Sequence, residues 1–434
     1  MNEHEVPQEA LVQPSAPAQS QVRPASSVEC SGASGALSER PKRGQRIWGA
    51  AVAVWKYLCG MLFCQSLLGS VVVLGWTYRA AQRYTLRCWW KRSLLGKSGE
   101  TFERFMASHE SLLAQTRWPN WFVNPQGREE MAQARDQGFP RRATALSKAL
   151  VRSLWLNFKT GCLGILNLWV LTLPAGALWL FSWYDGWNNS FNKGYEQAAV
   201  GPLTGILGVV WFIAVMFYVP MAQARQASTG QWRSFYQYRL VRGLIKRRWL
   251  ACLGLAMLCS ALTLPASILK TVPAYFPQIS PAWSNITPAQ ALHALNNYFF
   301  WCALYVFAAF VVLRLVAARI YAGAVLEAVQ GGSLDAEDLA PHEREALQKL
   351  GLLQPKAQAA RPRLIRALTW FGTRLGRAVA GILVALVWFS LVAQIYTSEF
   401  LNYHPGTGWL NQPTMQLPWF RYVPSHHEKN QASP

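Results

Sequence analysis

Residues 299–320 read FFWCALYVFAAFVVLRLVAARI, an unbroken apolar run in which the only charged residues are Arg314 and Arg319. The hydrocarbon core of a bilayer is about 30 Å thick, so a helix needs about 20 mostly apolar residues to cross it. Inside a bilayer every backbone donor and acceptor has to be satisfied within the segment, which selects a helix. The run therefore predicts a membrane-spanning helix.

Five further stretches of the chain are apolar and long enough to cross. They cover about residues 51–76, 161–183, 203–221, 250–272 and 378–395. A membrane barrel would instead show alternating segments of about ten residues. Charged residues make up only 15% of the chain, well below the share in a soluble domain. The sequence predicts an all-α, polytopic transmembrane bundle of about six membrane helices.

The formal net charge of +21 invites a nucleic-acid interpretation, but the charges follow the predicted topology. Residues 77–154 and 222–249 are strongly basic, whereas residues 184–202 and 273–298 contain one Lys between them. Alternation of this kind is the positive-inside pattern. We therefore expect no nucleic-acid partner. We expect basic loops in the cytoplasm, contact with anionic lipid headgroups, and residence in a bacterial inner (plasma) membrane.

Composition divides the chain into seven segments. They are a disordered N-terminal tail (1–46), a first membrane segment (47–78), a basic cytoplasmic loop with amphipathic helices (79–154), a four-helix membrane core (155–322), a cytoplasmic helical connector (323–376), a last membrane helix (377–396) and a non-cytoplasmic Pro/aromatic tail (397–434). The first membrane segment has basic flanks on both sides, so it either crosses or forms a re-entrant hairpin that bends near Gly60.

The second and fourth apolar stretches resemble each other. Each contains Cys-Leu-Gly, at residues 162–164 and 252–254, followed by Leu-Thr-Leu-Pro-Ala at residues 171–175 and 262–266. Each is preceded by a basic amphipathic stretch and followed by a returning span, which predicts a parallel two-helix repeat. Pro174 and Pro265 are then expected to kink their helices. The matched kinks frame a cavity in one interpretation and are ordinary membrane-helix kinks in the other.

Basic side chains supply the candidate lipid contacts. Arg79, Arg83 and Arg87 recur every four residues, with Leu86 and Trp89 on another face, as in a helix that lies on a membrane surface. An ordinary solvated helix face explains the same spacing. Arg314 and Arg319 are candidates for the same role, although a side chain near the end of a span can also reach the interface without binding anything.

Two further segments contain candidate sites. Asp185, Trp187 and Asn188 collect aromatic and polar groups in one turn on the non-cytoplasmic side, as either a headgroup pocket or part of an aromatic belt. In the connector, Pro341 is suited to the first position of a helix. That helix is expected to carry Glu343 on an exposed face.

Catalytic chemistry is not apparent in the sequence. The chain contains no H-E-x-x-H, G-x-S-x-G, Walker or dinucleotide glycine pattern, no carboxylate in the middle of a span and no metal-ligand spacing. We therefore favour a non-enzymatic role, without excluding an enzyme, and expect no cofactor. The leading hypothesis is a scaffold or lipid-interacting membrane component, with protein partners or a homo-oligomer as further candidates. A carrier for an amphiphilic or anionic substrate and a lipid-metabolism enzyme are the alternatives.

Overall fold

The computed structural model describes most of the chain as helices. The described residues are 43–98, 101–107, 130–134, 138–192, 200–280, 283, 286–354, 365, 367–379, 381–383 and 385–386. Within these residues there is no strand, which confirms the all-helical class. Residues 1–42 of the expected N-terminal tail (1–46) lie outside them, whereas residues 43–46 are helical. The expected C-terminal tail (397–434) and parts of the basic loop also lie outside the described residues.

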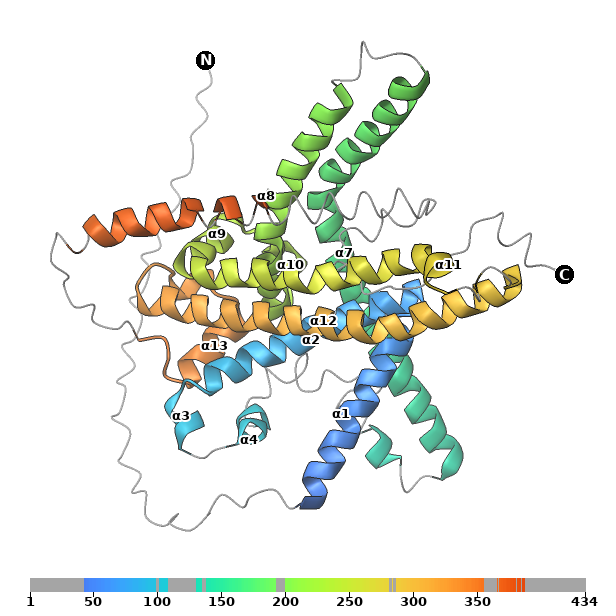
Figure 1. Ribbon diagram of the computed structural model, residues 1–434. Coiled ribbons are helices and arrows are strands. Elements are labelled where there is room, and N and C mark those ends of the chain that lie inside the picture. Colours follow the sequence, from blue (N-terminus) through green and yellow to red (C-terminus); the bar gives the residue numbers. More distant parts are fainter. Residues whose placement is uncertain are drawn as a thin grey trace, which may run out of the picture. The chain divides into compact units, whose positions relative to one another are not determined.

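The first apolar stretch is not one continuous helix. Helix α1 (Arg43–Phe63) ends at a break over residues 64–66, and α2 (Leu67–Trp90) then leaves in a different direction (Figure 1). Ser66 starts α2 because its side chain accepts a hydrogen bond from the Gly69 amide at 3.0 Å. The expectation of a single helix over residues 51–76 is therefore wrong, and the break lies a few residues beyond Gly60.

Helix α7 (Phe139–Asn192) joins two segments that the sequence separated. Its basic beginning and its apolar centre form one helix of 54 residues. The helix continues past Pro174 and includes residues 184–192, which the sequence predicted to be a loop. A helix of this length rises about 80 Å, far more than the hydrocarbon thickness. The return helix α8 (Val200–Thr229) packs extensively against α7.

The next helical pair differs from the first, because its basic stretch is a separate helix. Helix α9 (Tyr238–Arg247) ends at Arg248, after which α10 (Trp249–Thr271) contains the second matched proline. The return helix α12 (Pro288–Gln330) begins with a capping box between Thr287 and Gln290. Figure 1 shows α12 between α10 and α2, and it contacts both. The repeat therefore stays a prediction.

Residues 130–133 and 367–379 are also helical. Short elements lie between and after the long helices. They are α3 (Leu94–Lys97), α4 (Phe102–Ala107), η3 (Trp232–Tyr236), η4 (Val272–Tyr275), α11 (Phe276–Ile279), η6 (Ala336–Asp338) and α13 (Pro341–Lys349). Pro341 starts α13, as the sequence predicts.

Four helical stretches are long and apolar enough to cross a membrane, judged by length and composition. They are Phe139–Leu178, Leu203–Thr229, Trp249–Thr271 and Pro288–Gln330. They indicate an integral membrane protein, although six spans are not confirmed. The apolar part of α1, Ala50–Phe63, is shorter, and most of the predicted last span lies outside the described residues.

Close packing of α2 against α7 depends on two glycines. A Cβ atom at Gly75 would lie 1.7 Å from the carbonyl oxygen of Asn157, and one at Gly161 would lie 2.0 Å from that of Val71. Small residues are favoured between membrane helices because apolar side chains gain nothing by leaving lipid, so close backbone approach supplies the attraction. Gly75 and Gly161 therefore set the distance between α2 and α7.

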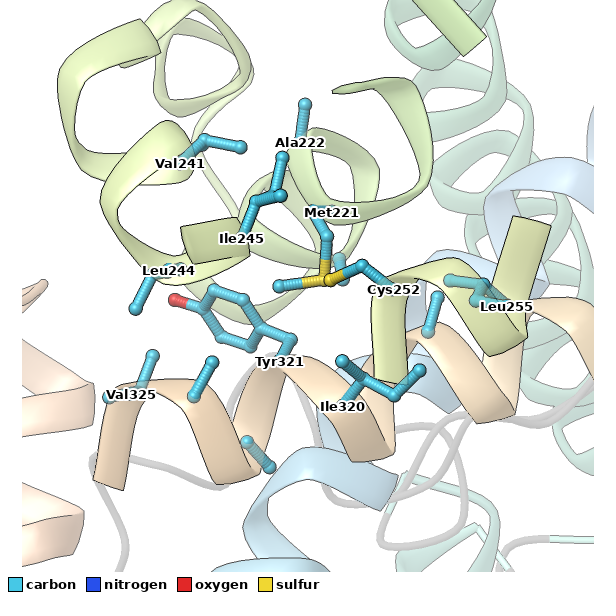
Figure 2. Close-up of a cluster of buried hydrophobic side chains, with 14 of the residues drawn as sticks. Met221, Ala222, Val241, Leu244, Ile245, Cys252, Leu255, Ile320, Tyr321 and Val325 are labelled. Carbon is cyan, nitrogen blue, oxygen red and sulfur yellow. The ribbon is translucent and has the colours of Figure 1, made fainter. Parts of the chain in front are cut away.

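Part of the largest apolar cluster among the described residues lies where the ends of α8 and α12 meet α9. Figure 2 shows Met221 of α8, Ile245 of α9 and Tyr321 of α12 converging. Val241 and Leu244 of α9 are buried in the same cluster. The apolar face of this basic amphipathic helix therefore covers protein.

Candidate functional site

The three arginines that the sequence places on one face of α2 have different surroundings. Arg79 is buried, and its Nη1 donates to Oδ1 of Asn157 on α7 at 2.8 Å. Arg83 is half-buried and forms an ion pair of 2.5 Å with Glu103 of α4. Only Arg87 is exposed. Arg79 and Arg83 thus contact other residues of the protein. Contact of either side chain with lipid stays a prediction.

The apolar face of the same helix is turned inward. Leu86 and Trp89 are buried, and the indole Nε1 of Trp89 donates to the carbonyl oxygen of Ala322 on α12 at 2.8 Å. The aromatic face of α2 therefore covers α12, and contact of its basic face with a membrane surface stays a prediction. Tertiary contact with α12 overrides the amphipathic pattern, because the same apolar stripe can be buried against protein or lipid.

Four exposed cations gather around the half-buried Cys88 of α2. They are Arg87 of α2, Lys91 and Arg92 directly after its last residue, and Arg319 of α12, and we name them the basic cluster. Burial raises the pKa of the Cys88 thiol, whereas the charges of Arg92, Arg319, Lys91 and Arg87 act in the opposite direction. In the described part of the chain, no ion pair joins a cation of the cluster to an acidic side chain.

The structure brings together two residues that are far apart in the sequence, Arg87 and Arg319, each of which the sequence predicts as a lipid contact. Lys91 and Arg92 were not among the predicted site residues. The four-residue spacing from Arg87 to Lys91 was a signal for one of them, because residues four apart on a helix lie on one face. Four cations from the end of α2, the turn that follows it and α12 can together bind phosphate or another anionic group.

Comparison with known proteins does not assign the chain to a family. No family model, curated protein or solved structure matches the chain. The residues themselves therefore carry the functional argument.

Arg314 occupies a second site, deeper along α12. Its guanidinium carbon lies 4.9 Å from the ring centroid of Phe310 and 5.7 Å from that of Tyr78. It lines a cavity of about 40 Å³ together with Gln223 of α8 and Cys259 of α10. Among the described residues, no acidic side chain forms an ion pair with Arg314.

A buried ion pair connects α13 to the membrane helices. Nη1 of Arg225, near the end of α8, lies 2.6 Å from Oε2 of Glu343 on α13, with exposed side-chain fractions of 2% and 0%. The hydroxyl of Tyr321 on α12 accepts from Arg225 at 2.8 Å and donates to Glu343 at 2.9 Å. The prediction that Glu343 lies on an exposed face is wrong.

Further hydrogen bonds satisfy the remaining groups of this pair. Nη2 of Arg225 donates to the carbonyl oxygen of Asp338 at 2.9 Å, and its Nε donates to Gln237 at 3.1 Å. Ser228 of α8 donates to Glu343, which also accepts from the amide of Ala340 at 3.2 Å. The position of Glu343 at the third residue of a helix that begins with proline was a signal for this capping contact. Its partner Arg225 could not be deduced from sequence.

Aromatic side chains contact the two proline-containing turns at equivalent positions. The indole Nε1 of Trp211 on α8 donates to the carbonyl oxygen of Leu171 at 2.9 Å. The hydroxyl of Tyr305 on α12 donates to that of Leu262 at 2.8 Å. Each acceptor precedes its proline, Pro174 or Pro265, by three residues, so both returning helices support the matched prolines alike. Kinks at these prolines stay a prediction.

The hydroxyls that precede the prolines are also used. Thr172 donates to the carbonyl oxygen of Leu168 at 3.0 Å, and Thr263 donates to that of Cys259 at 2.7 Å. The carbonyl groups that lose a donor to the prolines are those of Val170 and Ala261, four residues before each proline, so the threonine hydroxyls bond different carbonyls.

The predicted non-cytoplasmic pocket is not tested. Asp185, Trp187 and Asn188 belong to the backbone of α7, but their side chains lie outside those described. In the described part of the chain, no group of three His, Cys, Asp or Glu residues is placed to hold a metal ion.

Proposed function

We propose that this protein is a non-enzymatic membrane component that binds anionic lipid headgroups at the basic cluster. The observation that carries the proposal is the contact of α2 with α12 at the Trp89–Ala322 hydrogen bond, which brings Arg319 near the exposed Arg87, Lys91 and Arg92 around Cys88. These side chains are exposed, so they are free to meet a headgroup. The headgroup of an anionic lipid carries a net negative charge that attracts these cations, whereas the headgroup of a neutral lipid carries none.

The place of the cluster along α12 suits a headgroup. Arg319 is the second-last residue of the apolar run 299–320, so it would lie near the end of the hydrocarbon region. Basic residues next to a span gain about 1 kcal/mol each from an anionic surface. Guanidinium groups also bind phosphate oxygens through two parallel hydrogen bonds.

The charge pattern supports a cytoplasmic position for the cluster. The adjoining α9 exposes Arg239, Arg242 and Lys246, and the connection from α8 to α10 contains no acidic residue. Positive connections of this kind stay on the cytoplasmic side of a membrane. We propose that the basic cluster and α9 face the same cytoplasmic leaflet.

The carrier hypothesis receives less support. A carrier for an amphiphile needs a large cavity between its helices, and the Arg314 cavity has a volume of about 40 Å³. That is room for about three water molecules, since one needs about 10–15 Å³ by the same measure. A pocket of several hundred Å³ is typical for a larger ligand.

The proposal is tested by lipid enrichment around the purified full chain. The protein is reconstituted into nanodiscs that contain mainly phosphatidylcholine and a minor share of phosphatidylglycerol, and the lipids retained after extraction are quantified by mass spectrometry. We expect phosphatidylglycerol to be enriched around the wild-type protein and the enrichment to disappear in the double variant Arg87→Gln/Arg319→Gln.

A matched control removes the same charge elsewhere. Arg239→Gln/Arg242→Gln changes two exposed cations of α9, which lie outside the basic cluster. This variant should keep the enrichment. Equal losses in both double variants would show that only net charge matters, and unchanged enrichment in the cluster variant would exclude the cluster as the binding site.

A further inference from the structure

The Arg314 cavity presents a problem of charge balance. Arg314 lies on α12 within a stretch that is long and apolar enough to cross a membrane. Its neighbours in the cavity wall are Leu168 of α7, Gln223 of α8 and Cys259 of α10. None of these side chains is acidic, and no described carboxylate pairs with Arg314.

Aromatic rings only partly offset the cost of this charge. Arg314 contacts the rings of Phe310 and Tyr78, and a contact of this kind stabilises a cation by about 0.5–2 kcal/mol. Removing an ion from water in a protein costs several kcal/mol, which is normally offset by an ion of opposite charge. An anion bound in the cavity beside Arg314 would therefore offset the remaining free-energy cost of burying this charge.

The volume of the cavity restricts what the anion can be. About 40 Å³ accommodates a monatomic ion with one or two water molecules, but not a carboxylate substrate or a sugar. The wall is mostly apolar, so a weakly hydrated monovalent anion would lose less on entering than a multiply charged one. The wall also contains the neutral side chain of Gln223, whose amide has two N–H donors and already forms a hydrogen bond with Tyr78, so one donor is left for an anion.

We propose that the Arg314 cavity binds a small monovalent inorganic anion such as chloride, with the Arg314 guanidinium as its charged partner and the Gln223 amide as a second donor. The site is separate from the basic cluster and does not depend on the proposed binding of lipid headgroups. The four helices that form its wall, α7, α8, α10 and α12, are the ones that contain the four candidate spans. An anion bound there would hold these helices together.

The test uses the purified full chain in an uncharged detergent. Thermal unfolding is followed as chloride replaces gluconate, an anion too large for the cavity, at constant ionic strength. We expect the midpoint temperature to rise with chloride and to saturate. In Arg314→Gln the response should disappear, whereas in Arg239→Gln, which removes the same charge from an exposed position of α9 outside both proposed sites, it should remain.

A direct measurement of chloride binding distinguishes a lost anion site from a variant that is merely unstable. Broadening of the chloride NMR signal by the protein reports binding without reference to stability, and Arg314→Lys keeps the charge while weakening the contact. We expect broadening with the wild-type protein, at least tenfold weaker binding with Arg314→Lys and none with Arg314→Gln. Equal chloride responses in wild type and Arg314→Gln would overturn the proposal. So would stabilisation by anionic lipid with no response to chloride, because the site would then take a headgroup phosphate.

Discussion

Arg225 near the end of α8 and Glu343 of α13 form an ion pair with an Nη1–Oε2 distance of 2.6 Å, and both side chains are buried. The contact joins residues that are separated by 118 positions in the chain. Together with Tyr321 of α12 it connects the connector helix to two helices that are long enough to cross a membrane.

This ion pair gives a first prediction. Glu343→Gln should lower the free energy of unfolding by about 3–5 kcal/mol, because it leaves the buried Arg225 without its counter-ion. The double variant Arg225→Met/Glu343→Leu should cost less than the sum of its single variants, since no unpaired charge remains. Unfolding of the purified protein in detergent measures both effects.

A surface pair is the control for that experiment. Glu345→Gln removes the partner of Lys349 in an ion pair four residues apart on the same helix, where about 0.5 kcal/mol or less is expected. Similar losses for Glu343→Gln and Glu345→Gln would show that the buried pair contributes no more than a surface pair.

The glycine contact between α2 and α7 gives a second prediction. Gly161→Ala should destabilise the protein by about 1–3 kcal/mol, because the new methyl group would meet the Val71 carbonyl oxygen and force two backbones apart. In the same helix, a Cβ at Gly176 meets nothing within 4 Å. Gly176→Ala should therefore be neutral or stabilise by up to about 1 kcal/mol. Thermal unfolding measures both effects. Equal changes in the unfolding temperature of the two variants would contradict the close approach of α2 and α7 at Gly161.

The aromatic donors beside the prolines give a third prediction. Tyr305→Phe removes the hydroxyl that bonds the Leu262 carbonyl oxygen, and Trp211→Phe removes the corresponding indole N–H at Leu171. Interhelical hydrogen bonds in membranes average about 0.6 kcal/mol, so each change should lower stability by about that amount. Tyr238→Phe, at an exposed tyrosine, is the control and should have no effect. A loss confined to one of the two sites would argue against equivalent support of the prolines.

The basic cluster gives a fourth prediction, on thiol reactivity. Because burial raises the pKa of Cys88, its thiolate fraction at pH 8 is below that of a free cysteine, and maleimide labelling should accelerate as pH rises. Arg319 acts to lower this pKa, so Arg319→Gln should raise it further and slow labelling at fixed pH. Peptide mass spectrometry measures the rate at Cys88. Faster labelling in Arg319→Gln would contradict the arrangement, and Arg239→Gln on α9 should leave the rate unchanged.

The break between α1 and α2 gives a fifth prediction. The apolar part of α1 rises only about 20 Å, less than the hydrocarbon thickness, before the chain turns at residues 64–66. Single cysteines introduced at the exposed Ala50 and Lys97 should therefore react with a membrane-impermeant maleimide from the same side of sealed vesicles. Reaction from opposite sides would establish a single crossing instead.

The class of the fold follows from the sequence because hydrocarbon leaves the backbone few choices. Apolar runs such as residues 299–320 and 203–221 are long and continuous, and a helix is the structure that satisfies their backbone groups internally. The helical start at Pro341 was predictable for a similar local reason. The pattern of basic and non-basic connections was also readable, although the orientation that it predicts stays to be tested.

Other features depend on partners that are distant in the chain. The four-residue spacing of the arginines in α2 indicates one helix face, but α7 and α4 determine that Arg79 and Arg83 contact protein. Likewise the amphipathic pattern with Leu86 and Trp89 does not say whether lipid or α12 covers the apolar face. The extent of a helix depends equally on its surroundings, which explains why α7 continues through residues expected to form separate segments.

The sequence by itself determined that this chain is helical and rich enough in apolar helices for a membrane, because length and hydropathy are local properties. Only the tertiary structure decided which charges are buried in pairs, as Arg225 and Glu343 are, and which gather at the surface, as Arg87 and Arg319 do. Burial of a charge depends on the free energy of all the groups that surround it. Those groups come from helices that only folding brings together.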